Sequence, residues 1–394
     1  MKYILLIILK YFDKYFILAT CRLLKLSKKR NKISKNIDSF DKNNAKVLFI
    51  KLWGIGNNVF LLPLLEAVKI SYPNANIYIL TLEQNKGVYK NSPFVKCAYG
   101  INIRNPFALA HSLVGILDDL KKKNLDIIFD LEQFVKISTL VAQMLKAKLM
   151  VGFDTPNQNR GEFYDIVIPY NNNHIHILEN LSQIIKPMGI YINKLKLTPI
   201  SVSTEDKHHV FNFLTKYSQL DKEILIGIHV GSGINFTGRR WPLDSFVKLT
   251  NKLTRLNAIR VIFTGNKKET VLIRKIINNL ENKSRIVDVS CKFDISELAF
   301  LISICKVFIS NDTGPVHIAA AMGTSVVGLY GPNDPDIYGP YTDNKLVFYK
   351  NLSCSPCITN LNAKISFCLY NRCMRNIEVA EVYDGIVNNY LIDR

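Results

Sequence analysis

The sequence predicts an α/β protein that consists of two Rossmann-like domains. Two stretches carry this prediction: the apolar strand Lys46–Ile50 and the apolar strand Ile224–Val230 each run into a glycine turn. Strands that alternate with helices through such turns are typical of parallel sheets with ligand sites at their carboxyl edges. The length of 394 residues allows two separate cores. We therefore expect a central cleft, which the two domains face, as the ligand site.

The composition favours a folded enzyme over a nucleic-acid-binding protein. Hydrophobic residues make up 48% of the chain, and the net charge is +19. A basic balance fits nucleic acid, an anionic membrane or anionic substrates. The sequence shows no zinc finger, helix-turn-helix or RNA-binding aromatic motif, and many lysines lie among asparagines. We therefore expect no nucleic-acid partner.

The N-terminal segment, residues 1–45, predicts an amphipathic helix followed by a basic linker. Residues 3–26 are apolar, but Lys10, Asp13 and Lys14 interrupt them too early for a membrane span. On a helical wheel the charged side chains gather on one half, and five Lys or Arg residues follow between positions 28 and 35. This pattern favours a helix that lies on an anionic membrane surface over one that docks on the protein itself. No cleavable signal peptide is expected.

The first Rossmann-like domain is predicted over residues 46–205. Its first strand leads into the turn Trp53–Asn58, and Tyr72-Pro73-Asn74 ends the helix that follows. Gly54-Ile55-Gly56 lacks the third glycine of a dinucleotide fingerprint, so the turn is either a tight connection or a ligand turn. The further predicted elements are a helix at 58–71, strands at 77–80 and 126–130, and a helix at 135–147.

The second domain is predicted over residues 222–375, with a C-terminal helix at 376–394. Asp294 and Glu297 have the spacing of a capping box that opens a helix at 295–304. Asp334-Pro335-Asp336 resembles an acidic metal-binding pair, but the surrounding Gly and Pro residues favour a loop. Further strands are predicted at 261–264, 285–289, 307–309 and 325–332, and a helix begins near Leu243.

The stretch Ser310–His317 predicts an anion site. It joins a short apolar strand to a helix, where Asp312 or Thr313 can cap the helix and Pro315 fits its first turn. The free N–H groups and the positive dipole end of such a helix attract anions, and His317 stands within the first turn. Arg239 and Arg240 follow another strand and can clamp a pyrophosphate. Together these residues indicate a phosphate-bearing ligand, a nucleotide sugar.

Four of the eight cysteines cluster near the C-terminus. Cys354, Cys357, Cys368 and Cys373 have the spacing C-x2-C-x10-C-x4-C. Thiolates at such spacing can bind zinc or another metal, and the alternative is a loop of reduced thiols in a reducing compartment. The sequence leaves these two interpretations open, and we predict no metal in the active site.

The motifs together resemble the heptosyltransferases of lipopolysaccharide synthesis, glycosyltransferase family nine, over roughly residues 46–380. The strongest match is Asn311–His317 followed by Gly328–Pro332, and Arg239–Pro242 and Lys51–Pro63 match two further elements. The cysteine cluster, with Met374 after it, is similar to one in a branch of the family. The resemblance implies the GT-B fold.

The family resemblance also implies an activity. It predicts inverting, metal-independent transfer of a heptose or related sugar from an ADP-sugar to a lipid-linked glycan hydroxyl, without a cofactor. The location implied with the N-terminal segment is cytoplasmic, on the inner face of the plasma membrane. The predicted donor-binding residues are Arg239, Arg240, Glu269, Phe293, Asp312, Thr313, Gly314 and His317. The predicted acceptor-binding residues are Gly56, Asn57, His174 and His176.

One position departs from the family pattern. The family reads Gly-Asp at the first turn, with the Asp as presumed base, whereas this chain reads Gly56-Asn57. An amide cannot act as a general base near neutral pH. Asp130 or Glu132 at a strand end is therefore a candidate base, or Asn57 acts by position. A catalytically silent scaffold protein and an epimerase of GT-B shape are the rival predictions.

Overall fold

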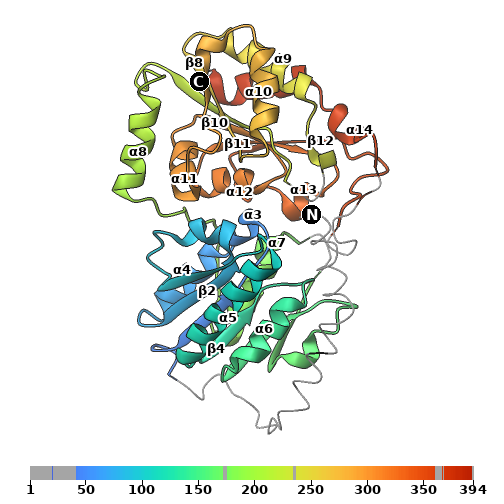
Figure 1. The fold of residues 1–394 in the computed structure, drawn as a ribbon. Coiled ribbons are helices and arrows are strands. Elements are labelled where there is room, and N and C mark those ends of the chain that lie inside the picture. The colour runs from blue at the N-terminus through green and yellow to red at the C-terminus, as the bar shows by residue number, and fades with distance from the viewer. Residues whose placement is uncertain are drawn as a thin grey trace. The chain divides into compact units, whose positions relative to one another are not determined.

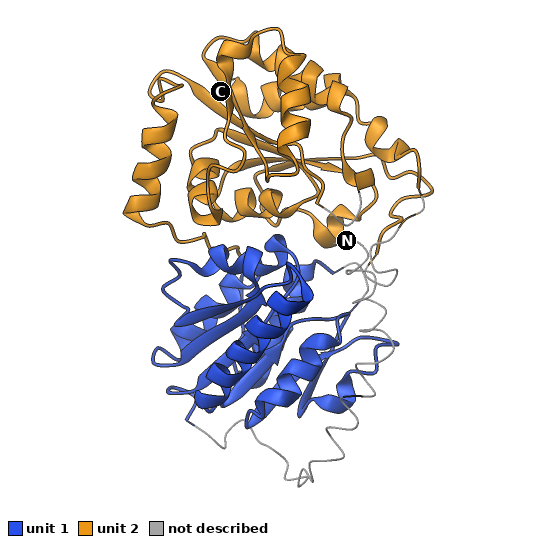
Figure 2. Ribbon diagram, viewed as in Figure 1, with its two compact units in different colours: residues 1–195 blue, residues 196–394 orange. Residues whose placement is uncertain are grey.

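The computed structural model describes residues 41–171, 175–233, 237–359, 366 and 368–392, together with Thr20. The chain divides into two compact units, residues 1–195 and 196–394 (Figure 2). Apart from Thr20 and residues 41–45, the predicted N-terminal helix and linker lie outside the described residues. None of the helices that the structure describes is both long and apolar enough to cross a bilayer.

The first unit contains a six-stranded sheet in the order β3-β2-β1-β4-β5-β6, and all its strand pairs are parallel. The predicted strands at 46–50, 77–80 and 126–130 correspond to β1, β2 and β4. Because β1 lies beside β4, the chain reverses its winding direction between them. The strands are β1 (Lys46–Ile50), β2 (Asn76–Leu82), β3 (Cys97–Ile101), β4 (Ile127–Asp130), β5 (Leu149–Asp154) and β6 (Ile166–Pro169).

Where the sequence predicted one helix at 58–71, the structure has two. Pro63 lies in the first turn of the second helix, and it has no N–H to continue a helical bond from the preceding turn.

Leu48, Ile50 and Leu80 belong to a core cluster of this unit. Figure 1 shows α5 and α6 lying along the sheet. The helices are α3 (Ile55–Val59), α4 (Leu62–Ser71), α5 (Pro106–Lys122), α6 (Ile137–Leu145) and α7 (Ile177–Ser182).

The second unit repeats this winding with a sheet in the order β12-β11-β10-β7-β8-β9, again parallel throughout. Read from β9, the strands follow the same order as in the first unit. The winding reverses between β7 and β10. The strands are β7 (Ile224–His229), β8 (Ile259–Thr264), β9 (Ile286–Asp288), β10 (Val307–Asn311), β11 (Ser325–Tyr330) and β12 (Lys345–Tyr349).

The capping box that the sequence predicted at α11 is present. The Asp294 side chain accepts the Glu297 N–H, and the Glu297 side chain accepts the Asp294 N–H. The predicted C-terminal helix is shorter than expected, since a π-helical turn at Val387–Leu391 follows α15. The helices are α8 (Thr204–Leu214), α9 (Leu243–Thr254), α10 (Thr270–Asn278), α11 (Ile295–Ser303), α12 (Gly314–Ala321), α13 (Pro335–Tyr338), α14 (Arg372–Arg375) and α15 (Val379–Ile386).

Candidate active site

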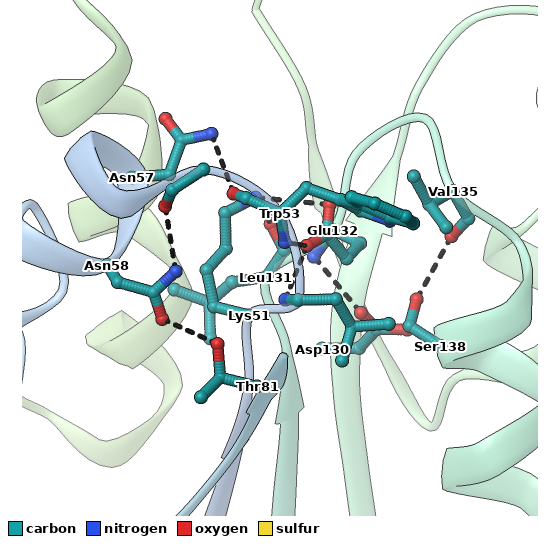
Figure 3. Close-up of polar contacts among 12 residues, drawn as sticks. Lys51, Trp53, Asn57, Asn58, Thr81, Asp130, Leu131, Glu132, Val135 and Ser138 are labelled. Atoms are coloured by element: carbon teal, nitrogen blue, oxygen red, sulfur yellow. Dashed lines mark hydrogen bonds and ion pairs between the residues drawn. The ribbon is translucent and has the colours of Figure 1, made fainter. Parts of the chain in front are cut away.

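In the first unit, Glu132 joins the loops that follow β1 and β4. Its Oε1 accepts the backbone N–H groups of Leu52 at 2.7 Å and Trp53 at 3.1 Å. Its Oε2 lies 3.1 Å from Lys51 Nζ, and both side chains of this ion pair are buried (Figure 3). The carboxylate thus accepts two backbone N–H groups and pairs with an ammonium, which are strong, charge-assisted contacts. Glu132 therefore fixes the two loops against each other at the point where a parallel sheet opens a crevice.

Asp130, at the end of β4, is fully buried and makes several charge-assisted bonds. Its Oδ2 accepts hydrogen bonds from Arg160 Nη2 at 2.7 Å, Tyr164 Oη at 2.7 Å and Ser138 Oγ at 2.8 Å. Its Oδ1 accepts the Glu132 N–H at 3.0 Å. Burial raises the pKa of Tyr164, so its phenol stays protonated and donates. Both carboxylate oxygens are thus engaged inside the unit, an arrangement suited to an anchor rather than to the predicted base.

Asn57 projects from α3 beside the end of β1. Gly54, the residue before this helix, has φ +83°, a left-handed conformation that favours glycine. The half-buried Asn57 donates from Nδ2 to the Trp53 carbonyl at 3.2 Å (Figure 3). Because Nδ2 is occupied by the turn, Oδ1 is the atom of this amide that is left to accept a ligand hydroxyl.

The neighbouring Asn58 holds the same turn from the inside. Its Nδ2 donates to Gly54 O at 2.8 Å, and its Oδ1 accepts the hydroxyls of Thr81 at 3.0 Å and Tyr89 at 2.8 Å. Asn58 is fully buried. Sequence reasoning missed this residue, although a second amide directly after Asn57 in an otherwise apolar helix was a visible signal.

Two N–H donors near this crevice are buried without a hydrogen-bond partner among the described residues. They are Trp53 Nε1 and Gln133 Nε2, and Gln133 is 4% exposed. These residues follow β1 and β4, whose ends the Glu132 bonds connect. Buried donors without partners are costly and call for an explanation, such as a ligand with acceptor oxygens.

Of the other predicted acceptor residues, His176 caps a helix. Its Nδ1 accepts the Leu178 N–H at 3.1 Å, and its ring packs edge-on against Phe60 at 5.3 Å. The ring is 8% exposed. Gly56 is buried within α3, and His174 lies outside the described residues. This geometry gives His176 a structural role in the first unit.

In the second unit, Arg239 and Asp312 connect the loops after β7 and β10. Arg239 Nη1 donates to Asp312 O at 3.0 Å and lies 3.3 Å from its Oδ2, while Nη2 donates to Ser232 O at 2.7 Å. Asn333 Nδ2 donates to the same Asp312 Oδ2 at 3.0 Å. Arg239 Nε is buried without a partner among the described residues. The guanidinium is thus held in place through Nη1 and Nη2, while its Nε–H group stays unpaired.

Helix α12 begins beside Asp312 without a side-chain cap among the described residues. Thr313, one of the two predicted residues, is at the N-cap position, but its hydroxyl donates to Asn311 O at 3.2 Å instead of capping the helix, and Asp312 binds Arg239. Pro315 lies in the first turn as predicted, and His317 is 7% exposed within that turn. An uncapped helix N-terminus leaves N–H groups and the positive dipole end available to an anion.

Asn311 fixes the crevice of the second unit. Its Nδ2 donates to Val230 O at 3.0 Å and Gly231 O at 2.8 Å, and its Oδ1 accepts the Trp241 N–H at 3.0 Å. The side chain is fully buried. Asn311 therefore ties β10 to the loop after β7 and to the arginine segment, a role that the sequence motif did not reveal.

The family model of glycosyltransferase family 9 (heptosyltransferase) matches residues 115–365, more than half of the chain. The protein belongs to this family. The lipooligosaccharide heptosyltransferase 2 of Campylobacter jejuni is 25% identical over 345 residues, 86% of this chain and 97% of that protein. The lipopolysaccharide heptosyltransferase 3 of Escherichia coli K12 is 24% identical over 304 residues, 75% and 85% of the two chains. The resemblance predicted from the motifs is confirmed.

Solved structures confirm the predicted GT-B fold of this glycosyltransferase. A family 9 glycosyltransferase of Veillonella parvula superimposes with a TM-score of 0.75 at 20% identity, covering 89% of this chain and 99% of that one. The ADP-heptose heptosyltransferase II of E. coli gives 0.71 at 18% identity, covering 88% and 98%. The E. coli heptosyltransferase WaaC, solved with ADP, gives 0.67 at 18% identity, covering 87% and 99%.

The glycosyltransferase holds Glu269, a predicted donor residue, near the ends of β7 and β8. Glu269 Oε2 accepts the Asn266 N–H at 2.9 Å and lies 3.7 Å from His229 Nε2. Burial lowers the pKa of His229, which favours its neutral form. A Cβ at Gly231 would collide with the Glu269 carboxylate and lie 2.7 Å from His229 Nε2, so a larger residue here would displace these side chains. The Glu269 carboxylate is therefore in close contact with the glycine turn that follows β7.

The remaining predicted residues occupy different surroundings. Arg240 Nη2 lies 3.4 Å from Ser232 Oγ, and burial lowers the pKa of this guanidinium. Phe293 is half-buried and packs edge-on against His209 and Phe213 of α8. Among the described residues, no group of three or more His, Cys, Asp or Glu side chains could hold a metal ion.

Proposed function

We propose that this family 9 enzyme is an inverting transferase that moves a heptose or related sugar from an ADP-sugar to an envelope glycan. The observation that carries the proposal is the uncapped N-terminus of α12 beside the fixed guanidinium of Arg239. A pyrophosphate carries the negative charge and the acceptor oxygens that this arrangement can bind. The named ligand of the similar WaaC structure, ADP, agrees with a nucleotide diphosphate donor.

The donor residues take complementary roles in this proposal. The N–H groups around Thr313 and Gly314, together with Arg239 and Arg240, neutralise the pyrophosphate. Glu269 accepts hydrogen bonds from ribose hydroxyls, since an ionised carboxylate is acceptor-only. The apolar edge of Phe293 contacts the adenine. Asp312 and His317 orient the phosphates and the sugar.

The first unit is proposed to bind the acceptor glycan. Trp53 Nε1 and Gln133 Nε2 are unpartnered donors, so they suit the ring, hydroxyl or carboxylate oxygens of a sugar. Asn57 Oδ1 accepts the hydrogen of the attacking hydroxyl and orients its oxygen. Asp130 and Glu132 act as anchors of the two loops, since their oxygens are engaged within the unit.

The reaction then needs no base among these three residues. The acceptor oxygen forms a bond to C1 of the sugar as the C1–O bond to the diphosphate breaks, with inversion at C1. The electron pair leaves with ADP, whose charge α12 and Arg239 stabilise. The hydroxyl proton, made acidic as the new bond forms, passes to solvent. A general base commonly contributes about 10²–10⁴ in rate, so a slow enzyme is expected.

The protein is further proposed to act at the inner face of the plasma membrane, through the basic N-terminal segment predicted over residues 1–35. Membrane vesicles that contain anionic lipid should sediment the full-length chain, and deletion of residues 1–35 should abolish this. Continued sedimentation of the shortened chain would refute the membrane role of this segment.

The first test is calorimetric titration with ADP, UDP and GDP in the presence of a chelator. Binding of ADP in preference to the other two supports the donor site. Transfer from ADP-heptose to acceptor extracted from the host then tests the reaction, and release of an altered sugar without acceptor would indicate an epimerase. The alternative function is a catalytically silent scaffold protein, which is favoured by Asn57 in place of the family's presumed base. This alternative is supported if no nucleotide binds and no sugar is transferred.

A further inference from the structure

Asn333, in the turn after β11, has a side-chain amide whose nitrogen is hydrogen-bonded and whose oxygen is not. The residue is 1% exposed. Its Nδ2 donates to Asp312 Oδ2 at 3.0 Å, whereas its Oδ1 has no hydrogen-bond partner among the described residues. The amide cannot be reversed, because a carboxylate accepts but does not donate, and Oδ1 would then face Oδ2. The unpartnered atom is therefore an acceptor oxygen.

The turn that carries Asn333 is held from outside, so the side chain cannot easily swing into solvent. Pro332 O accepts the N–H groups of Cys357 at 2.9 Å and Ile358 at 3.0 Å. A Cβ at Gly331 would lie 2.6 Å from Met374 Sδ and 2.8 Å from Cys373 Sγ, so this backbone is in close contact with the segment around α14. A buried acceptor without a partner in such a rigid place carries a desolvation cost that a ligand can relieve.

The two unpartnered atoms that flank Asp312 have opposite chemistry. Arg239 Nε is a donor, which suits the oxygens of a phosphate, whereas Asn333 Oδ1 is an acceptor. Phosphate oxygens in their ionised form cannot donate to Oδ1. The group that satisfies Asn333 must therefore carry a hydroxyl or an amino hydrogen, and a hexose or heptose carries several hydroxyls.

We propose that Asn333 is a specificity-determining residue of the donor site, whose Oδ1 accepts a hydrogen bond from one hydroxyl of the transferred sugar. Its Nδ2 meanwhile holds Asp312. The inference rests on the proposed function, because it assumes a nucleotide sugar at α12 and Arg239. It goes further in assigning the sugar, rather than the nucleotide, to this residue. A donor that lacks the hydroxyl leaves Oδ1 unpaired in a buried site and is rejected.

The test compares ADP with ADP-heptose, and then with ADP-sugars that each lack one hydroxyl, by calorimetric titration. Wild-type protein should lose about tenfold in affinity for one deoxy donor. Asn333→Ala should lose about tenfold for ADP-heptose, less than twofold for ADP, and should no longer distinguish that deoxy donor. Asn333→Thr serves as a second, polar variant if thermal unfolding shows that the alanine variant is unstable, and it should show the same loss of discrimination.

Asn344→Ala is the matched control. Asn344 precedes β12, at the end of the sheet away from the ligand turns, and donates to Ser325 Oγ at 3.0 Å. It should leave all affinities unchanged. Equal losses for ADP and ADP-heptose in Asn333→Ala, or unaltered discrimination among deoxy donors, would overturn the inference alone. Failure of the wild type to bind either nucleotide would instead overturn the proposed function and the inference with it.

Discussion

The two units of the protein have the same strand order but use the polar residues at their switch points differently. In the first unit, Asp130 and Arg160 are 0% exposed, and their charged groups bind partners within the unit. In the second unit, Arg239 is held by Asp312 and Ser232 but keeps Nε unpaired, and α12 has no side-chain cap among the described residues. The charged groups at the first switch point are thus paired within the unit, whereas Arg239 at the second keeps an unpaired N–H group.

This difference matters for interpreting any carboxylate at a strand end. Asp130 is the last residue of β4 and Asp312 follows β10, and both lie at the switch point of a parallel sheet, where ligand-binding residues are expected. Asp130 accepts three donors on one oxygen, whereas Asp312 Oδ2 accepts from one guanidinium and one amide. Position alone therefore does not separate the proposed anchor Asp130 from the proposed ligand-binding residue Asp312, whereas the donors around each carboxylate differ.

The largest effect on stability is expected from removing the buried Arg160–Asp130 ion pair of the first unit. Arg160→Met removes the guanidinium that contacts Asp130, Thr139, Tyr164 and the Glu132 carbonyl, and leaves a buried carboxylate without its cation. Such a change costs about 3–5 kcal/mol in the free energy of unfolding. Urea denaturation of the purified variant at neutral pH measures it.

Arg255→Met provides the comparison for that measurement. It also removes an arginine from an ion pair, with Glu281 at 2.9 Å, but these side chains are 68% and 59% exposed. Its effect should stay below about 1 kcal/mol. If the two variants unfold at the same urea concentration, Asp130 and Arg160 do not brace the first unit as described.

In the second unit, we expect a substitution of Arg239 to cause a smaller loss of stability and a large loss of ADP affinity. Arg239→Gln removes a charged donor from the proposed pyrophosphate site, whereas Asn333 still binds Asp312. A hydrogen bond to a charged group is worth about 1.5–3 kcal/mol, so ADP affinity should fall roughly 10- to 100-fold. Calorimetry with ADP measures this. Arg274→Gln on α10, an exposed residue with the same charge change, should bind ADP like the wild type.

The features predicted correctly from sequence depend on neighbours along the chain. The strand predicted at 307–309, which is Val307–Asn311 in the structure, the Asp294–Glu297 capping box and Pro315 in a first helical turn were visible as local patterns. Alternation of apolar strands with glycine turns was enough for the fold class. The split of the predicted helix at 58–71 could also have been found, because Pro63 lacks the N–H that a continuous helix requires.

The features that were missed depend on residues far apart in the chain. Arg160 meets Asp130 across 30 positions, and Arg239 meets Asp312 across 73. Thr313, not Asp312, is the N-cap residue of α12, and the Asp312 carboxylate contacts Arg239 instead of the helix. Spacing within the sequence carries no information on such pairs, so the predicted base Asp130 and the predicted cap Asp312 rested on position alone.

The smallest effect is the change in transfer rate expected from a substitution at Asn57. It tests most directly whether the first unit serves the acceptor and the second unit the donor. Asn57→Asp gives the acceptor side a carboxylate at the family's usual position, but loses the donor to Trp53 O and places two oxygens together. The transfer rate should therefore rise only about tenfold, below the ~10²–10⁴ of a well-placed base. Steady-state kinetics should show this gain only above the pKa of the new carboxyl, whereas ADP affinity, set in the second unit, stays unchanged. Asn58→Asp, altering the buried amide that holds the turn, should lower the rate instead. A wild-type rate that already equals or exceeds that of Asn57→Asp at every pH would mean that an unidentified base serves the acceptor.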